Sequence, residues 1–548
     1  MTRLAVALAL LALVARLYAL GEAPPGIHVD AAANAWSARC LAATGTDWNG
    51  TPWPILYSRG YGENQSTLYY YLLLPFQAVF GMSAWSTALP SAVGGALSVL
   101  LLYVLAARLF DAWTGLAAAA ALAAAPWHLL FGRWGHESGI VPLLVLAPLV
   151  LISVSNLPLG RASGQPPRIA IAALAGGSVG VCCYGYYAVR IFLPALLLAC
   201  AGAQLEDWRA LLRTRRGRGA VLVFLLGAAV TLGPLAASHL LDPATSKRGS
   251  VMLLWSPADG IAVRVGKVAA RYLAHFGTPF LFGRGDAFPL HEIPGGGPLL
   301  LSLLPWMLIG AAAVVSRLRI SPSARVLGAW VLLYPLSDCF TRHPTPNLLR
   351  SSPGLIGLAL LAAVGFVAVL RWGARWAWAL AVVGALLFLG ETGVRTHRFF
   401  DRFRHRADLY SLYNADLLEA AVRIRPRLAG VDAIFVSTRR SAGMCCRSSC
   451  ANTTSKLDVA ESSVRSRWSV STVKSHRRAK RLHNSSGVSH RSTTVIAVAG
   501  FAVRATIARR PLSAHPAIRT LRPEAESSRR RTGSTTATSR PGDPARRW

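Results

Sequence analysis

The sequence predicts an all-α polytopic membrane protein, and three observations lead to this fold class. Of its 548 residues, 53% belong to the set AVILMFWYC, only 15% are charged, and the mean hydropathy is +0.40. A soluble domain carries charge at about a quarter of its positions. The apolar residues also gather in blocks of about 17 to 21 residues, the length that a helix needs to cross about 30 Å of hydrocarbon. Soluble and disordered interpretations of the whole chain are therefore excluded.

Eleven apolar segments are expected to cross the membrane. The first, residues 2–20, is too long and too evenly apolar for a signal-peptide core, and no small-x-small cleavage site follows it, so we expect a retained anchor. Residues 66–81 are rich in tyrosine at one end and interrupted by Pro75, which suits a helix lying at the membrane interface. The other expected spans are residues 89–109, 112–130, 138–155, 169–187, 190–205, 219–240, 298–315, 324–341, 352–370 and 375–391.

The distribution of arginine predicts the orientation of these spans. Five of the loops on alternate sides hold 13 arginines, whereas the short loops on the other side hold four: Arg133, Arg190, Arg342 and Arg350. Cytoplasmic loops carry the excess of positive charge. This places two long loops, at about 21–88 and 241–297, and everything after about residue 392 on the extracytoplasmic side. The predicted location is therefore the cell membrane, with several passes.

Carboxylates and imidazoles then gather on the extracytoplasmic face, where we expect the chemistry to occur. Ionisable groups are costly in a bilayer and mark functional surfaces. The formal net charge of +34 would suggest nucleic acid, but its excess lies in topogenic loops and in the C-terminal part of the chain, so no nucleic-acid partner is expected. The external groups are Asp30, Glu63, Arg133, His136, Glu137, Asp286, His291, Glu292, Arg342, His343 and Arg350.

The first motif, PPGIHVDAAANAW at residues 24–36, delivers Asp30 at the membrane boundary. A carboxylate in a medium of reduced dielectric can accept a proton from an incoming hydroxyl. Alternatively, Asp30 only caps the helix that follows it.

The second motif, GRWGHE at residues 132–137, holds Arg133 and Glu137 four residues apart. These two side chains could form a local ion pair, or they could serve a substrate, because the planar guanidinium suits a phosphate group.

Two later motifs are rich in glycine and arginine. In the segment GRGDAFPLHEIPGGGP, at residues 283–298, the glycines could let backbone amides approach a phosphate, or they could simply form a turn before a helix. In RHPTPNLLRS, at residues 342–351, two arginines bracket a Pro-x-Pro turn. They could be solvated loop charges or phosphate ligands.

Taken together and in order, these motifs resemble the bacterial GT-C glycosyltransferases of family 39 and related enzymes, akin to protein O-mannosyltransferases and the aminoarabinose lipid A transferase. The resemblance rests on PPGIHVDAAANAW, TGTDWNGTPWPIL, YGENQSTLYYYLLLPFQAVFG, APWHLLFGRWGHESG, FGRGDAFPLHEIPGGGPLL and HPTPNLLRSSPG, and it covers about residues 1–400. It implies a GT-C transmembrane helical bundle with extracytoplasmic loops. It also implies transfer of a sugar from a polyprenyl-phosphate carrier to a protein, lipid or cell-envelope glycan.

The resemblance also implies roles for individual residues. Asp30 matches the general base, but Ala31 stands where many relatives have a glutamate, which puts a role of the acidic pair in doubt. Glu137 matches a second acidic residue. The resemblance further implies that Arg350, Arg342 and Arg133 bind the donor phosphate. It implies further substrate contacts for Glu63, His136, Asp286, His291 and His343. No cofactor or metal ligand set is predicted, and nothing supports a divalent cation.

The C-terminal part of the chain changes character. After the 1–400 domain, residues 401–440 read as the start of a soluble extracytoplasmic segment. Residues 441–548 contain 21 Lys and Arg against five Asp and Glu, and 30 of these residues are Ser or Thr. This composition indicates either a basic disordered tail or a shifted reading frame that replaces a missing domain, and we favour the second. An open alternative frame downstream of codon 440 would support it.

The resulting hypothesis is an inverting, lipid-carrier-dependent hexosyl- or pentosyltransferase with Asp30 as general base. A transporter or lipid flippase is the alternative from another class, but it would place charges at the bilayer midplane of several spans. An inactive, truncated relative is the third interpretation.

Overall fold

The computed structural model describes residues 1–60, 63–160, 164–241, 253–424, 496–498 and 501–503. Two units separate by their contacts, Met1–Arg423 and Ile424–Trp548. Of the second unit, the described part holds Ile424 and one antiparallel pair of short strands, β3 (Ile496–Val498) and β4 (Phe501–Val503). The rest of the 441–548 tail lies outside the described residues, as do residues 425–440.

The first unit is built almost entirely of helices, so the predicted all-α class is confirmed. A single short hairpin, β1 (Ser58–Gly60) with β2 (Glu63–Gln65), is the other regular element among its described residues. The longer helices are α1 (Thr2–Leu17), α2 (Val29–Thr44), α3 (Leu68–Phe80), α4 (Ala84–Leu109), α5 (Ala112–Ala124), α7 (Val141–Val154), α8 (Ile169–Cys183), α9 (Tyr187–Gly202), α11 (Arg215–Leu241), α13 (Ile261–Ala274), α14 (Leu304–Arg317), α15 (Pro322–Leu333), α16 (Leu348–Leu370), α17 (Arg375–Arg404) and α19 (Ala415–Ile424).

Short elements join these helices at both ends of the bundle. They are α6 (Pro126–Phe131), α10 (Leu205–Leu212) and α18 (Ala407–Leu412), together with the 3₁₀ turns η1 (Glu137–Ile140), η3 (Pro289–His291) and η4 (Leu301–Leu303) and the π-turn η2 (Pro279–Gly283). Pro126 comes one residue after the C-cap of α5, Ala125, and is separated by it from the last helical residue, Ala124. A proline cannot donate the backbone hydrogen bond that would continue that helix.

Helices occupy all eleven segments that were expected to cross the membrane, and α3 occupies the expected interfacial segment. By length and composition, five described helices can span a bilayer: Ala84–Leu109, Glu137–Val154, Arg215–Leu241, Leu348–Leu370 and Arg375–Arg404. A sixth span arises if α9 and α10, bent by 77° at their junction, count as one. Other apolar helices, such as α5, α8 and α15, are shorter than 18 residues, and Pro126 divides the apolar segment 112–130 between α5 and α6.

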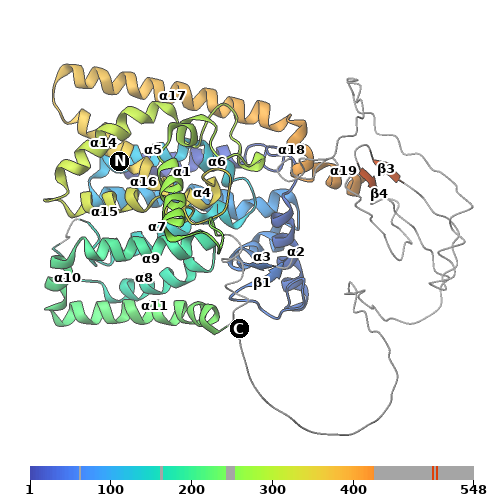
Figure 1. Ribbon diagram of the computed structural model, residues 1–548, viewed down its shortest axis with the longest axis horizontal. Helices are drawn as coiled ribbons and strands as arrows, with labels where there is room; N and C mark the ends of the chain where they lie inside the picture. Colours follow the sequence, from blue (N-terminus) through green and yellow to red (C-terminus); the bar gives the residue numbers. More distant parts are fainter. Residues whose placement is uncertain (61–62, 161–163, 242–252, 425–495, 499–500, 504–548) are drawn as a thin grey trace, which may run out of the picture. The chain divides into compact units, whose positions relative to one another are not determined.

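Close helix packing brings the centre of the bundle together. α4 packs against α1, α5 and α7, and α16 packs against α5 and α14. A Cβ on Gly310 of α14 would lie 2.0 Å from the Leu361 carbonyl oxygen of α16, and one on Gly365 would lie 2.0 Å from that of Trp306. The two backbones therefore touch, as small residues allow in membrane helices. In Figure 1, α17 and α11 lie along opposite edges of this bundle.

The guanidinium of Arg16 is buried inside the bundle. Arg16 of α1 is fully buried, donates to the Ala12 carbonyl, and lies 2.9 Å through Nη2 from His128 Nδ1. Gly95 and Gly132 leave room for it, since a Cβ on either would lie 2.6 Å from Arg16 Nε. Both glycines thus form a cradle for a guanidinium.

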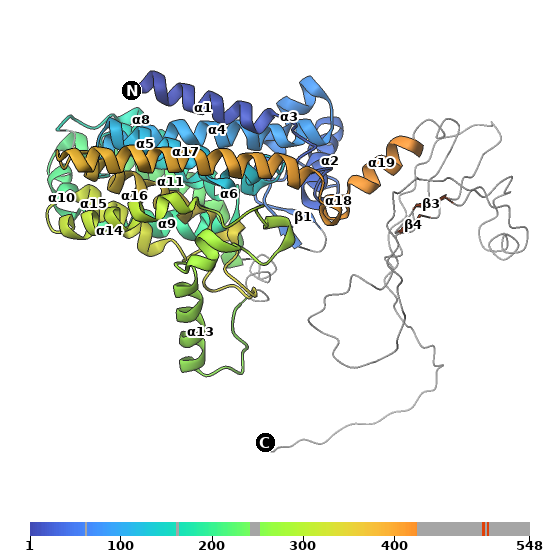
Figure 2. The same cartoon turned by 90° about the horizontal axis from the view of Figure 1, so that it is seen from above.

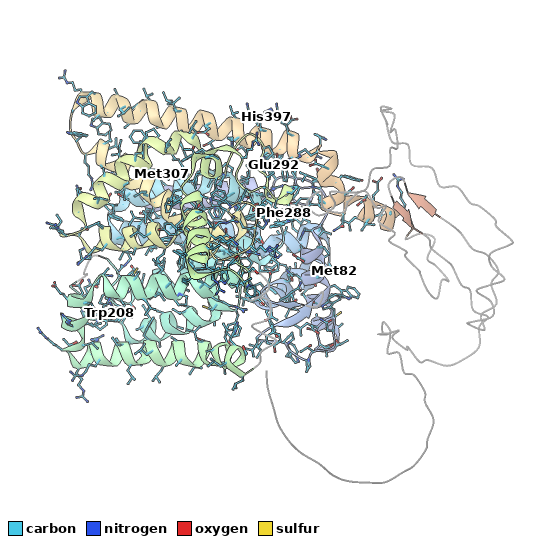
Figure 3. The ribbon with its side chains drawn as sticks, viewed as in Figure 1. Met82, Trp208, Phe288, Glu292, Met307 and His397 are labelled. Atoms are coloured by element: carbon cyan, nitrogen blue, oxygen red, sulfur yellow. The ribbon has the colours of Figure 1, made fainter. Side chains whose placement is uncertain are left out.

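The loops gather at one end of the bundle and hold the candidate site. Figure 1 shows α2, α3, β1 and α18 at the end opposite α10 and α15. Figure 2 shows α13 projecting from the side of the bundle, across the direction of the long helices. In Figure 3, Trp208 of α10 marks the far end, and Phe288 and Glu292 lie nearer the loop end.

Candidate functional site

Asp30 lies in the first turn of α2 and does not cap it. His28 is the N-cap residue, because its Nδ1 accepts from the Asp30 backbone N–H at 3.3 Å. The alternative that Asp30 serves only as a cap is therefore wrong, and its carboxylate is free for other contacts. The Asp30 side chain is 39% exposed, so a substrate can reach it.

The loop between α6 and η1 brings a histidine and a second carboxylate to Asp30. The Ser138 backbone N–H donates to His136 Nδ1 at 3.2 Å, which makes Nδ1 an acceptor and leaves the ring proton of a neutral imidazole on Nε2. That Nε2 lies 3.2 Å from Glu137 Oε2 and 3.8 Å from Asp30 Oδ2. One imidazole N–H thus faces both carboxylates.

Asn34 completes this group. Its Nδ2 donates to Glu137 Oε2 at 3.0 Å from the next turn of α2, so α2 supplies both Asp30 and the amide that holds Glu137. Sequence analysis missed Asn34, although residues four apart share a helix face. The group Asp30, Asn34, His136 and Glu137 is called the carboxylate cluster below.

Two buried histidines at the cluster are kept neutral by their surroundings. Burial lowers the pKa of His28 to about 4, with nearby His136 and His291 acting in the same direction and Asp30 opposing them. Burial likewise lowers the pKa of His291, although its hydrogen bond to Asp286 opposes that shift. Positive charge at neutral pH therefore does not come from these two rings.

The carboxylate cluster forms one side of the candidate site. The other side, called the second wall below, begins at Asp286. Its Oδ2 accepts from His291 Nδ1 at 2.6 Å and from the Leu348 backbone N–H, the first residue of α16, at 2.9 Å. Its Oδ1 accepts from the Phe288 backbone N–H at 2.9 Å, and Asp286 thus fastens the loop before η3 onto α16. Trp134 lies between the walls, with its ring 5.4 Å from His291 and 5.3 Å from His136.

Arg350 lies on this second wall beside an acidic residue that sequence analysis missed. Asp338 is fully buried, and its Oδ1 lies 4.0 Å from Arg350 Nη1. His275 Nε2 lies 3.3 Å from Asp338 Oδ2, and the Asn347 backbone N–H donates to the same oxygen at 2.9 Å. Asp338 was counted within the span 324–341; a lone carboxylate in an apolar segment is the signal that marks it.

The other predicted phosphate ligands lie in different settings. Arg342 is exposed, and its neighbour His343 places Nδ1 3.9 Å from Asp286 Oδ1. Arg133 does not join the group, because its buried guanidinium donates to the carbonyls of Ala15, Arg16, Ala19 and Ala23 at the end of α1. It makes no ion pair with Glu137 among the described residues. The Glu63 backbone lies in β2, and its side chain is outside the described residues.

The triple-glycine segment serves packing. Arg395 of α17 donates to the Gly297 carbonyl at 2.6 Å, and a Cβ on Gly296 would lie 1.9 Å from the same guanidinium. Gly296 has a φ of +153°, which glycine tolerates. These glycines accommodate Arg395, a contact that neither alternative anticipated.

The segment after α18 reaches back into the site. The Ile27 backbone N–H donates to the Tyr413 carbonyl at 2.6 Å, and Asn414 Nδ2 donates to the Ile27 carbonyl at 3.0 Å. Tyr413 also donates through its hydroxyl to the Leu290 carbonyl at 3.2 Å, beside His291. We call Tyr413 and Asn414 the C-terminal clip, because they join the loop before Asp30 to the loop of the second wall. No sequence signal identified it.

No group of three or more His, Cys, Asp or Glu in the described parts of the chain has metal-ligand geometry. The carboxylate cluster instead has the composition of a proton-transfer site: one accessible carboxylate, one imidazole donor and one buried carboxylate.

Comparison with known proteins agrees with the sequence resemblance. Residues 64–233 match a family model described as dolichyl-phosphate-mannose-protein mannosyltransferase. This match confirms the resemblance to the GT-C superfamily, in a segment that includes α3–α8 and the loop with Glu137. No curated relative matches the sequence.

Three solved structures with a similar arrangement are distant in sequence. ArnT from Cupriavidus metallidurans, bound to undecaprenyl phosphate, is 15% identical with a TM-score of 0.49, over 77% of this chain and 80% of that one. AglB, an oligosaccharyltransferase from Archaeoglobus fulgidus, is 15% identical with a TM-score of 0.46, over 72% and 55%. The arabinosyltransferase EmbB from Mycobacterium smegmatis gives 15% and 0.36, over 80% and 45%. The chain thus spans about half the length of the oligosaccharyltransferase.

Proposed function

We propose that this protein is a membrane glycosyltransferase that moves a hexosyl or pentosyl group from a polyprenyl-phosphate carrier to a protein, lipid or glycan acceptor on the extracytoplasmic face. The observation that carries the proposal is the carboxylate cluster, in which Asp30 and Glu137, 107 positions apart in the sequence, face one imidazole N–H. The match of residues 64–233 to a mannosyltransferase family model supports the class of reaction. The arginine asymmetry of the loops supports the side of the membrane.

Asp30 is the general base of the proposed reaction. It is the accessible carboxylate of the cluster, whereas Glu137 is buried and held by Asn34 and His136. The acceptor O–H gives its proton to Asp30 as its oxygen bonds to the anomeric carbon. The bond from that carbon to the phosphate oxygen breaks, and the electron pair leaves with polyprenyl phosphate. A single displacement of this kind inverts the anomeric centre.

The departing phosphate needs cations on the second wall. Arg350 and the exposed Arg342 are the proposed ligands, and Arg350 is oriented by Asp338. Arginine forms charge-assisted, bidentate hydrogen bonds with phosphate, and such contacts strengthen as charge develops on the leaving group. Arg133 is left out of this role because its donors are used by α1 carbonyls.

The test is transfer of label from radiolabelled polyprenyl-phosphate sugars in membranes containing the full chain. We expect Asp30→Asn to lower the rate by a factor of about 10² to 10⁴, the usual contribution of a general base. Asp401→Asn, at an exposed carboxylate of α17, is the matched control and should keep the wild-type rate. Full transfer by a correctly inserted D30N protein would remove the base assignment. Uptake of labelled solute without glycosyl transfer would favour a transporter.

A further inference from the structure

A cavity opens at the end of the bundle that lies far from the candidate site and is called the hollow below. It has a volume of about 510 Å³ and lies between the end of α4, the start of α5, the turn from α14 to α15, and the end of α16. The α16 residues that line it begin at Val364, 16 positions after Leu348, which contacts Asp286 on the second wall. At 1.5 Å per residue this is about 24 Å. The hollow is therefore distinct from the proposed catalytic site.

Two guanidinium groups and one carboxylate set its charge. Arg371 Nη2 lies 3.0 Å from Asp111 Oδ2. Asp111 already caps α5, because its Oδ1 accepts from the backbone N–H groups of Trp113 and Thr114. Arg317 also lines the hollow, is exposed, and makes no ion pair with any described residue. The hollow thus carries one positive charge that the described residues do not balance.

Apolar and aromatic groups flank these charges. Val364, Val367 and Ala368 of α16 form one wall. Trp372 at the rim is 67% exposed, and its ring meets that of Trp376 at 5.1 Å in an edge-on contact. Exposed tryptophans mark the level of lipid head groups, and basic pockets between membrane helices bind anionic heads. An amphiphile with a phosphate at one end would satisfy both parts of the hollow.

A neighbouring hollow shows that size alone does not make such a site. It measures about 570 Å³ and is lined by Arg108 and Asp207. There, the Arg108 guanidinium donates to the hydroxyl and carbonyl of Ser153 and to Asn156 Oδ1. The Arg108 guanidinium in this neighbouring hollow is already hydrogen-bonded, and the Asp207 carboxylate lines the same space. We therefore do not expect this hollow to bind an anion.

We propose that the hollow beside Arg317 and Arg371 binds the phosphate head group of an anionic phospholipid. Arg317 binds the phosphate, and Arg371 contributes from its pair with Asp111. The glycerol backbone and the first methylenes lie on the α16 wall, below Trp372. This lipid site is independent of the proposed sugar transfer, because none of its residues belongs to the carboxylate site.

Native mass spectrometry of the purified full chain tests the proposal with phosphatidylglycerol as the probe. The variant pair Arg317→Gln and Arg371→Gln is compared with Arg319→Gln and Arg375→Gln, arginines of the same two turns that do not line the hollow. We expect the first pair to weaken phosphatidylglycerol binding about tenfold and the second to leave it unchanged. The single variant Arg317→Gln, which breaks no described ion pair, serves if the double variant does not fold.

Three outcomes would overturn the proposal. Equal loss in both pairs would mean that diffuse positive charge attracts the lipid. Unchanged binding in R317Q would mean that the hollow holds no phosphate. Displacement of the lipid by inorganic phosphate in the millimolar range would identify the ligand as the free anion. D30N should bind phosphatidylglycerol as the wild type does, whatever its transferase activity.

Discussion

Protonation of His28 should make the stability of the protein around the candidate site depend on pH. It caps α2 by accepting from Asp30, and its ring packs against Trp134 at 5.1 Å and against Tyr413 at 6.3 Å. Because burial lowers its pKa to about 4, the native state keeps the ring neutral while the unfolded chain titrates near 6.5. Above pH 6.5 the His28 ring is neutral in both the native and the unfolded state, so its protonation has no effect on stability.

Between about pH 6.5 and 4, His28 is protonated in the unfolded state but stays neutral in the native state. We expect the free energy of unfolding to fall by about 1.4 kcal/mol for each pH unit between about 6.5 and 4 from this group alone. His28→Asn keeps an acceptor near Nδ1 and should flatten the dependence of the melting temperature on pH. His397→Asn, at an exposed ring on α17, should keep the wild-type slope. A slope in H28N as steep as that of the wild type would contradict this account.

Individual site residues could be predicted from the sequence only where a loop motif exposed them. Asp30, His136 and Glu137 stood in motifs at span ends, and the structure brings them together. Arg133 stood in the same motif but is used by carbonyls of α1, a partner that no spacing reveals. Tyr413 was missed because its role depends on contacts with segments far away in the chain. Asp338 was missed although a lone carboxylate in an apolar segment is a signal that could have marked it.

At the scale of elements, the C-terminal clip determines where the loop before α2 lies. Gly26 has a φ of +85°, and a Cβ there would lie 2.4 Å from the Tyr413 carbonyl oxygen, so the loop and the clip are in direct contact. Asn414 itself has a φ of +53°, a left-handed conformation that asparagine tolerates. The clip therefore joins α2 to η3 through short polar contacts.

Replacing Asn414 by Asp tests the clip as a positioning element. The change removes the Nδ2 donor and places a carboxylate oxygen against the Ile27 carbonyl, so the loop bearing Asp30 should shift. We expect kcat to fall about tenfold with little change in the KM for the donor, since a small misplacement of a reacting group costs rate. Measured transfer kinetics with polyprenyl-phosphate sugars separate the two constants.

Asn156→Asp is the matched control for the clip. Asn156 also has a left-handed φ, +62°, and its Nδ2 donates to the Pro166 carbonyl at 3.1 Å at the far end of the bundle. The same chemical change there should leave both constants unchanged. A KM effect in N414D without a kcat effect would show that the clip binds substrate and does not position the base.

Elements were predicted with uneven success for a physical reason. Hydrophobic blocks located the apolar helices of the bundle because apolar length is a local property of the sequence, but they did not locate α13, an amphipathic helix within the 241–297 loop. Their ends were not predicted, since turns such as those around Pro126 and between α9 and α10 divide what reads as one block. The role of the glycines at 295–297 could not be predicted either, because the side chain that they accommodate, Arg395, lies about 100 positions later in the sequence.

At the scale of the whole molecule, the first unit extends to Arg423 and includes the clip. Two truncations of the chain separate the contributions of the clip and of everything after it. A chain that ends at Ile424 keeps α18, the clip and α19, and we expect it to retain wild-type transfer and melting temperature. A chain that ends at Arg406 should keep the helical bundle but lose transfer, because nothing then holds the Ile27 loop.

Transfer assays on membranes and thermal melts in detergent measure both properties. Equal activity of the two truncated chains would show that the clip is dispensable. Loss of transfer in both would show that residues beyond Ile424 take part in the function, which would count against a shifted reading frame as the origin of the 441–548 sequence.

The cradle around Arg16 has a consequence for biogenesis. The ribosome releases α1 long before it has made His128, and Gly95 and Gly132 also arrive later. Until then its guanidinium has only the Ala12 carbonyl of its own helix as a described partner, and a charge in an apolar helix of 16 residues is costly in lipid. We therefore expect stable insertion of α1 to depend on the synthesis of α4 and α6, which complete the cradle.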